Sequence, residues 1–321
     1  MFRLAALFGL LGLAVATGLI VWSGWAQVMQ ALEQAGWGIV VIALFHGISL
    51  VVSATGWRVL VSGKNRPSLP KFILFMWVRA AVNNLMPVAR IGGEVAAVRL
   101  MTAFGMRQSI AIAATVVELT LSIAAIFLFV AFGIILFAFR VNDNNTVSQL
   151  IWGLVLSLPL ILGLIAVQRF GFFTLMSRLF RLMFRDRWTA IVGNAARLDR
   201  AVASIYRRRG RVMLCAALQL LAWGLGSVEI WLALQFLGHP LSVSESVMIE
   251  ALIQASASAA FAIPGALGVQ EAGFLVFGGM LGLPADICAA LAVMRRCRDL
   301  IFYAPGLVVW QTHEGKRLLR K

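Results

Sequence analysis

The segment NNLMPVARIGGE, residues 83–94, carries two amides, a cation, a carboxylate, a proline and a pair of glycines within an otherwise apolar chain. The bilayer core offers no hydrogen bonds, so non-helical backbone at membrane depth occurs only where protein buries it or where it lines a cavity. A second segment, FAIPGALGVQE at residues 261–271, has the same combination of proline, glycine and a terminal carboxylate. We therefore predict that the remaining helices enclose two broken helical elements.

The composition indicates an integral membrane protein. Of the 321 residues, 61% are hydrophobic and 13% are charged, with a mean hydropathy of +0.91, whereas soluble domains carry about 25% charged residues. The net charge of +15 would suggest nucleic-acid binding in a soluble protein, but here it indicates cytoplasmic loops that face anionic headgroups. The three cysteines and three histidines are scattered, so no disulfide framework, metal site or cofactor is predicted.

Six membrane spans are expected, at residues 1–25, 37–60, 110–139, 147–167, 212–238 and 284–311. The first run resembles a signal peptide over its initial 16 residues, but its apolar stretch continues to Trp22, which favours an uncleaved span. Clusters of Lys and Arg follow the second, fourth and last spans, and such clusters mark the cytoplasmic side. Both termini are therefore expected in the cytoplasm.

Two further regions are too interrupted to cross the membrane. In residues 72–104 the apolar pieces on either side of Pro87 are each shorter than the ~20 residues that a spanning helix requires. Residues 247–281 show the same pattern around Pro264 and Gly265. We expect one hairpin that enters from the cytoplasm and one that enters from outside. The predicted fold class is an all-α polytopic membrane protein with about six spans and two re-entrant hairpins.

An offset of 177 residues (264 − 87) relates the two halves of the chain. It pairs Pro87 with Pro264, Glu94 with Glu271, Gly105 with Gly282, and Glu118 with Arg295. Two copies of opposite orientation are typical of inverted-repeat transporters, whose sites lie at the midplane where broken helices meet. We place the repeats at residues 37–140 and 212–311, within a single membrane domain. The alternative is that proline and glycine only kink ordinary membrane helices.

The connector between the repeats, residues 169–211, holds eleven arginines against two acidic residues. Aromatic and aliphatic side chains alternate with arginines between residues 172 and 185, a pattern typical of a basic amphipathic helix on a membrane surface. We expect the connector to contact anionic headgroups. The simpler alternative is a connector whose charge only sets the topology.

Candidate site residues flank the two breaks and occupy the middle of the last span. They are charged or polar at membrane depth, or they are prolines and glycines that expose backbone groups able to bind a headgroup. They comprise Arg79, Asn83, Asn84, Pro87, Arg90, Gly92, Gly93, Glu94, Glu118, Pro264, Gly265, Gly268, Gln270, Glu271, Arg295, Arg296, Arg298 and Asp299. Arginine adds bidentate recognition of phosphate or carboxylate.

These charges are expected to pair, because an unpaired charge near the bilayer centre costs several kcal/mol. We predict that three carboxylates pair with three arginines of the last span around one cavity: Glu94, Glu118 and Glu271 with Arg295, Arg296 and Arg298. Simpler interpretations exist at two positions. Arg90 can extend to cytoplasmic water, and Glu271 can serve as a helix cap.

These motifs resemble the flippase-like membrane domain shared with lysylphosphatidylglycerol synthases, over essentially the whole chain. The matching stretches are GWR at 56–58, VNNLMPVA at 82–89, GGE at 92–94, IPGALGVQE at 263–271 and RRCRDL at 295–300. The NNLMP form and the arginine run are most similar to the hopanoid-biosynthesis-associated branch of that family. Arg90, where Gln is commoner, and Asp299, where Glu is commoner, depart from the pattern. The aminoacyl-transferase domain of the synthases is not expected here.

The resemblance implies a bacterial inner-membrane protein that binds and translocates a lipid, either a hopanoid or its precursor. No catalytic constellation is recognisable in the sequence, so we do not expect an enzyme. Two alternatives remain open. One is a membrane-embedded enzyme or enzyme subunit that modifies a lipid headgroup, and the other is a scaffold that recruits hopanoid-biosynthesis enzymes. The expected partners are membrane lipids, and not nucleic acid.

Overall fold

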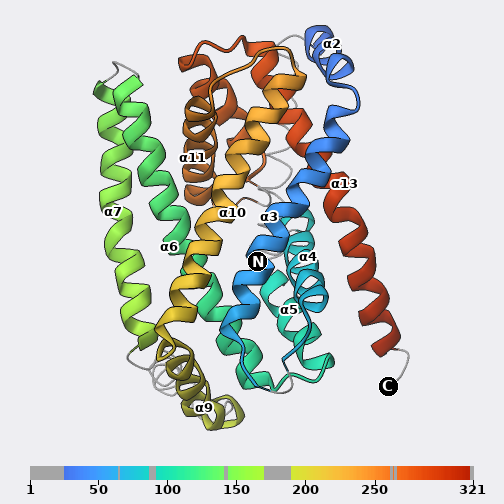
Figure 1. The fold of residues 1–321 in the computed structure, drawn as a ribbon, viewed down its shortest axis with the longest axis vertical. Helices are drawn as coiled ribbons and strands as arrows, with labels where there is room; N and C mark the ends of the chain where they lie inside the picture. Colours follow the sequence, from blue (N-terminus) through green and yellow to red (C-terminus); the bar gives the residue numbers. More distant parts are fainter. Residues whose placement is uncertain are drawn as a thin grey trace.

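The computed structural model describes residues 25–63, 66–86, 92–140, 144–169, 189–260, 263 and 266–318, and these residues form helices without any strand. In chain order the elements are α2 (Trp25–Ala35), α3 (Gly38–Leu60), α4 (Leu69–Leu85), α5 (Gly92–Ala103), α6 (Gln108–Arg140), α7 (Asn144–Arg169), α9 (Thr189–Tyr206), α10 (Arg209–Phe236), α11 (Val243–Ala259), α12 (Val269–Gly273), the π-helical turn η2 (Phe274–Gly278) and α13 (Ala285–Leu318). Figure 1 shows them as an elongated bundle. The prediction of an all-α fold is confirmed.

Four helices, α3, α6, α7 and α10, are long and apolar enough to cross a membrane. They coincide with four of the predicted spans. Helix α13 has 34 residues, but it carries three arginines and an aspartate near its middle, so its apolar character is interrupted there. The predicted first span, residues 1–25, lies almost entirely outside the described residues. So does the predicted amphipathic helix at residues 172–185.

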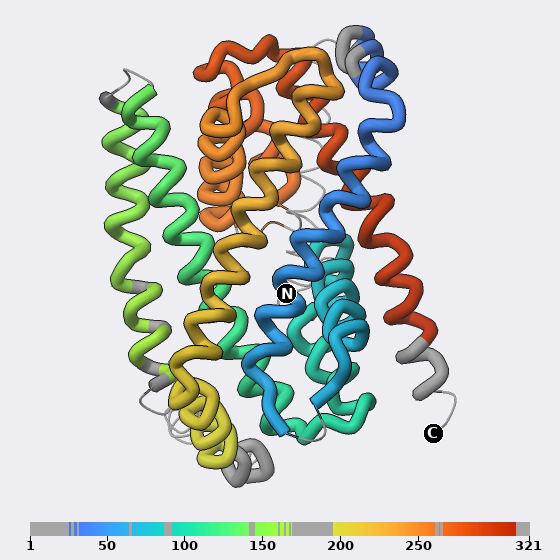
Figure 2. Tube along the Cα trace, in the orientation of Figure 1, coloured from blue at the N-terminus to red at the C-terminus, as the bar shows by residue number. Residues whose placement is uncertain are grey.

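Both predicted hairpins are present as pairs of short helices. Helices α4 and α5 have 17 and 12 residues. Helix α11 has 17 residues, and the returning limb consists of α12 and η2 with five residues each. None of these reaches the ~20 residues of a spanning helix. In Figures 1 and 2 the α4–α5 pair occupies the lower half of the bundle and α11 the upper half.

The two halves of the chain have the same order of elements and opposite directions. Helices α3, α4, α5 and α6 correspond in order to α10, α11, α12–η2 and α13. In Figure 1, α3 runs downward and α6 upward, while α10 runs upward and α13 downward. This arrangement agrees with the inverted repeats that the 177-residue offset predicted.

The apolar core is divided between the two halves. One cluster centres on Trp57, Phe72 and Phe75, which are fully buried and meet edge to face. A second cluster joins α2, α10, the returning limb and α13. Helix α6 approaches α11 closely, because a Cβ on Gly133 would lie 2.2 Å from the Cβ of Ala251. Large apolar side chains on the outer faces of α6 and α7 are exposed, as expected of surfaces that face lipid.

Candidate functional site

The first hairpin holds a buried ionic group that centres on Arg79 of α4. Its Nε donates to Glu94 Oε1 of α5 at 2.8 Å, and its Nη1 donates to Glu118 of α6. Glu118 is 1% exposed. Gln219 of α10 also donates to Glu118, at 2.8 Å, and accepts from Ser53 of α3 at 2.7 Å. One guanidinium therefore links both limbs of the hairpin to the long helix that follows.

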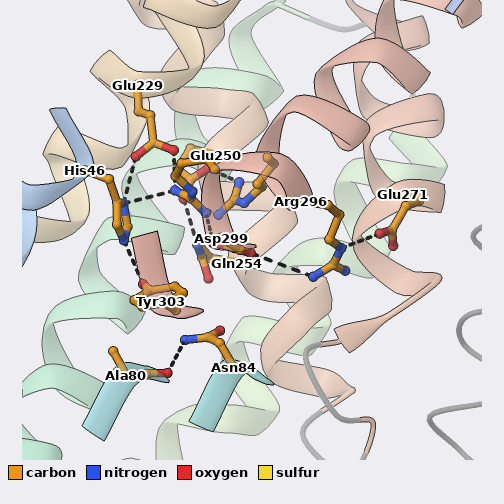
Figure 3. Close-up of polar contacts among 12 residues, drawn as sticks. His46, Ala80, Asn84, Glu229, Glu250, Gln254, Glu271, Arg296, Asp299 and Tyr303 are labelled. Atoms are coloured by element: carbon orange, nitrogen blue, oxygen red, sulfur yellow. Dashed lines mark hydrogen bonds and ion pairs between the residues drawn. The ribbon is translucent and has the colours of Figure 1, made fainter. Parts of the chain in front are cut away.

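Gly93 permits the close approach of the two limbs. A Cβ at this position would lie 2.3 Å from the carbonyl oxygen of Arg79 and 2.5 Å from Asn83 Oδ1. The Gly93 amide donates to Asn83 Oδ1 at 2.9 Å, and Asn83 Nδ2 reaches Glu94 at 3.4 Å. Asn84 lies apart from this group, since its amide donates to Ala80 O of its own helix (Figure 3).

The second hairpin binds α13 through two ion pairs. Arg295 makes a bidentate pair with Glu250 of α11, with bonds of 2.7 and 3.1 Å. Gln254 also donates to Glu250, at 2.7 Å. Arg296 donates to Glu271 of α12 at 2.7 Å (Figure 3).

Glu271 also closes the first turn of its helix. Its Oε2 accepts from the backbone amide of Gly268 at 2.7 Å, and Gly268 has a φ of +80° that favours glycine. The capping role and the ion pair are therefore both present in one carboxylate. The neighbouring Gln270 is buried on the same turn.

A third group joins α3, α10 and α13 around Arg298. This arginine is 5% exposed and contacts Glu229 of α10, Asp299 at 2.6 Å and His46 Nδ1 at 3.0 Å. His46 of α3 also lies 2.9 Å from Glu229 Oε2, and its Nε2 lies 2.7 Å from the hydroxyl of Tyr303. Figure 3 shows the imidazole between these partners. Its Nδ1 thus faces both a donor and an acceptor.

Each repeat has a buried ion pair between its hairpin and its long helix, and the signs of the two members are exchanged between the repeats. In the first repeat the hairpin helix supplies the cation and the long helix supplies the anion, as Arg79 and Glu118. In the second the hairpin helix supplies Glu250 and the long helix supplies Arg295. Glu118 and Arg295 are the residues that the 177-residue offset equates. The inverted repeat therefore reverses the polarity of its buried pair.

The predicted partners of two carboxylates were wrong. Glu94 and Glu118 pair with Arg79 and not with the last span, because the long side chain of Arg79 reaches from α4 to both α5 and α6. The pairing of Glu271 with an arginine of the last span is confirmed, with Arg296 as the partner. Four predicted site residues, Pro87, Arg90, Pro264 and Gly265, lie outside the described residues.

Sequence reasoning assigned no role to five residues that complete these groups: His46, Gln219, Glu229, Glu250 and Tyr303. Each is a polar side chain within a largely apolar stretch of helix, which is a signal in itself. Helices α3 and α10 each contact more than one ionic group. Ten residues, or ~15 Å of helix, separate Gln219 from Glu229 on α10.

The ionic groups leave some buried polar atoms unused. Glu94 Oε2 and Arg298 Nε are buried and make no hydrogen bond with any described residue. The first group holds two carboxylates for one guanidinium, and the α13 groups hold four carboxylates for three guanidiniums. Among the described residues, no set of three His, Cys, Asp or Glu side chains is placed to hold a metal ion. The arrangement is suited to hydrogen bonding with a polar group rather than to metal chemistry.

The fold and these buried ions define a polytopic helical membrane protein with two opposed hairpins. The model of the lysylphosphatidylglycerol synthase TM region matches residues 9–306, so the chain belongs to that family. The chain is also similar to the UPF0104 membrane protein PH1989 of Pyrococcus horikoshii, with 21% identity over 320 residues that cover 93% of each chain. No solved structure matches.

Proposed function

We propose that this protein binds the headgroup of a membrane lipid between the tips of its two hairpins and transfers the lipid across or out of the membrane. The observation that carries this proposal is the pair of opposed hairpins, each tied to a long helix by a buried ion pair. Buried ions are expensive in a membrane protein and mark substrate pathways. Inverted repeats with broken helices are the architecture of transporters with midplane sites.

Unused hydrogen-bonding capacity supports the choice of a polar headgroup. Glu94 Oε2 offers an acceptor and Arg298 Nε offers a donor, both buried within the bundle. A headgroup with hydroxyl, amine or phosphate groups can satisfy both kinds of atom. The exposed apolar faces of α6 and α7 suit the accompanying lipid tails.

A hopanoid or its precursor is the lipid that we propose, in a bacterial inner membrane with both termini in the cytoplasm. The support is the similarity of the NNLMP stretch and the RRCRDL run to the hopanoid-associated branch. The proposed action involves no covalent change to the lipid. An experiment must therefore distinguish this transport function from the alternative, a membrane-embedded enzyme that modifies a lipid headgroup.

Lipid analysis of a strain that lacks the protein makes this separation. We expect unchanged hopanoid species with an altered distribution between leaflets or membranes. Loss of one modified lipid species would contradict transport and favour an enzyme.

Purified protein in proteoliposomes provides the direct assay. A labelled hopanoid should become accessible to an external quencher faster with wild-type protein than with Glu250→Leu/Arg295→Met. Arg140→Ala, which changes an exposed arginine at the end of α6, is the matched control and should behave as wild type. Equal rates in empty and protein-containing liposomes would contradict the proposal.

A further inference from the structure

A separate cluster of arginines lies where the end of α3 meets the start of α10, at the lower end of the bundle in Figure 1. We define the Ser62 cluster as Arg58, Ser62, Arg66, Arg208 and Arg211. Arg208 Nη1 and Arg211 Nη1 both donate to Ser62 Oγ. Two guanidiniums from one helix end therefore converge on a single hydroxyl of the facing loop.

The loop after α3 brings two more guanidiniums to the same place. Arg58 Nε donates to Pro67 O at 3.1 Å, which fixes the loop against the helix end. Burial and the nearby charges of Arg58 and Arg211 lower the pKa of Arg66. Arg66 Nε is also buried and donates to no described residue. A buried donor without an acceptor is costly, and an anion bound at the loop would remove that cost.

No carboxylate in the adjoining sequence offsets these charges. Residues 58–71 contain two arginines and two lysines without an acidic residue, and residues 206–211 contain four arginines without one. Gathering like charges is unfavourable unless an anion compensates them. An anion bound beside the cluster would reduce this repulsion.

The start of α10 adds a further preference for an anion. This 28-residue helix begins at Arg209 without a side-chain cap. Its first turn therefore presents backbone N–H groups and the positive end of the helix dipole. A Cβ at Gly210 would meet nothing within 4 Å, so the surface there is open. Helix N-termini with these properties bind phosphate in many proteins.

We propose that the Ser62 cluster and the N-terminus of α10 form a binding site for a phosphate group. The arginines supply planar, bidentate donors, and Ser62 supplies a hydroxyl that orients two of them. Topology signals alone need only positive charge on one side of the membrane. The convergence of two guanidiniums on one hydroxyl is an additional property. It predicts that lysine cannot replace arginine in phosphate binding at this site. This site is separate from the proposed headgroup site between the hairpins.

Substitution of arginine by lysine tests the proposal because it keeps the positive charge and removes the planar guanidinium with its paired N–H donors. Protein in phosphatidylcholine nanodiscs would be titrated with phosphatidic acid, and bound lipid would be counted by native mass spectrometry. We expect Arg208→Lys/Arg211→Lys to bind phosphatidic acid about tenfold or more weakly than wild type, since charged hydrogen bonds are lost. Arg140→Lys is the matched control, and its affinity should not change.

Competition with inorganic phosphate shows whether the bound phosphate group belongs to a lipid or to a soluble compound. If inorganic phosphate displaces phosphatidic acid from wild-type protein, the site takes a soluble phosphate compound as well as a lipid. If it does not, the site takes a lipid phosphate. Both results support a phosphate site. Equal affinities of wild type and the double lysine variant would show that charge alone acts there, and that result would overturn the proposal.

Absence of any bound phosphatidic acid or phosphate on wild-type protein would also overturn it. Should the double variant fail to fold, Arg66→Lys serves in its place, because Arg66 lies on the loop and its Nε donates to no described residue. Its unfolding temperature without phosphate should equal that of wild type. The same loss of phosphatidic acid binding is then expected.

Discussion

Arg295 offers the sharpest test of how the buried ions act. Arg295→Ala would remove a bidentate partner from Glu250, whose side chain is 3% exposed. Among the residues that the structure describes, only Gln254 would then still donate to this carboxylate. Because breaking a buried ion pair leaves an uncompensated charge, we expect a loss of about 3–5 kcal/mol in the free energy of unfolding.

Two comparison variants separate stability from function. Glu250→Leu/Arg295→Met replaces both ions by apolar side chains and should retain most of the stability, since such replacements are often neutral. Arg140→Ala breaks an exposed pair with Glu245, at 3.4 Å and with the arginine side chain 64% exposed. That change should cost less than about 1 kcal/mol.

Reversible unfolding in mixed micelles, with titrated denaturing detergent, measures all three variants against wild type. The expected order of stability is wild type and Arg140→Ala first, the double variant next and Arg295→Ala last. The double variant should also fail in the liposome assay although it is folded. If Arg295→Ala were as stable as Arg140→Ala, the buried ion pair would not be the link between α11 and α13.

Three other changes probe different parts of the structure. Gly93→Ala should destabilise by about 1–3 kcal/mol because its Cβ would overlap Arg79 O, whereas Gly153→Ala, with open space around it, should lower thermal stability only slightly or not at all. His46→Ala should lower the unfolding free energy by about 1–3 kcal/mol through loss of buried contacts, and exposed His239→Ala should not. Hydrogen bonds from Ser242 lower the pKa of Glu245, so its contribution is present near neutral pH and is lost as the pH falls through that pKa. Glu245→Gln should therefore reduce the difference between unfolding temperatures at pH 7 and about pH 3, and an unchanged difference would contradict this.

Much of the architecture was predictable because it follows from local chemistry. Proline and glycine within apolar runs located both breaks, and run length separated hairpins from spans. The fixed offset between Pro87 and Pro264 indicated the repeat before any contact was known. These predictions do not depend on how the helices pack against one another.

The ionic partners could not be predicted in the same way, because they depend on packing. Glu118 and Arg295 are equivalent in the repeat and were expected to face each other, yet each finds its partner within its own half. That outcome requires α4 to turn Arg79 toward α6 and α11 to turn Glu250 toward α13. His46 was dismissed because the histidines do not cluster with one another. Its partners are instead a carboxylate, a guanidinium and a phenol from two other helices.

The reversed polarity of the two ion pairs makes the two repeats electrostatically different. The offset of 177 residues equates Glu118 with Arg295, and the hairpin partner is a cation, Arg79, in one half and an anion, Glu250, in the other. The two hairpin helices α4 and α11 therefore carry buried charges of opposite sign. The α3–α10 pair contacts two of the ionic groups, since Gln219 donates to Glu118 and Glu229 pairs with Arg298. If a headgroup binds between the hairpins as proposed, opposite charges at its two ends would therefore favour one orientation over the other.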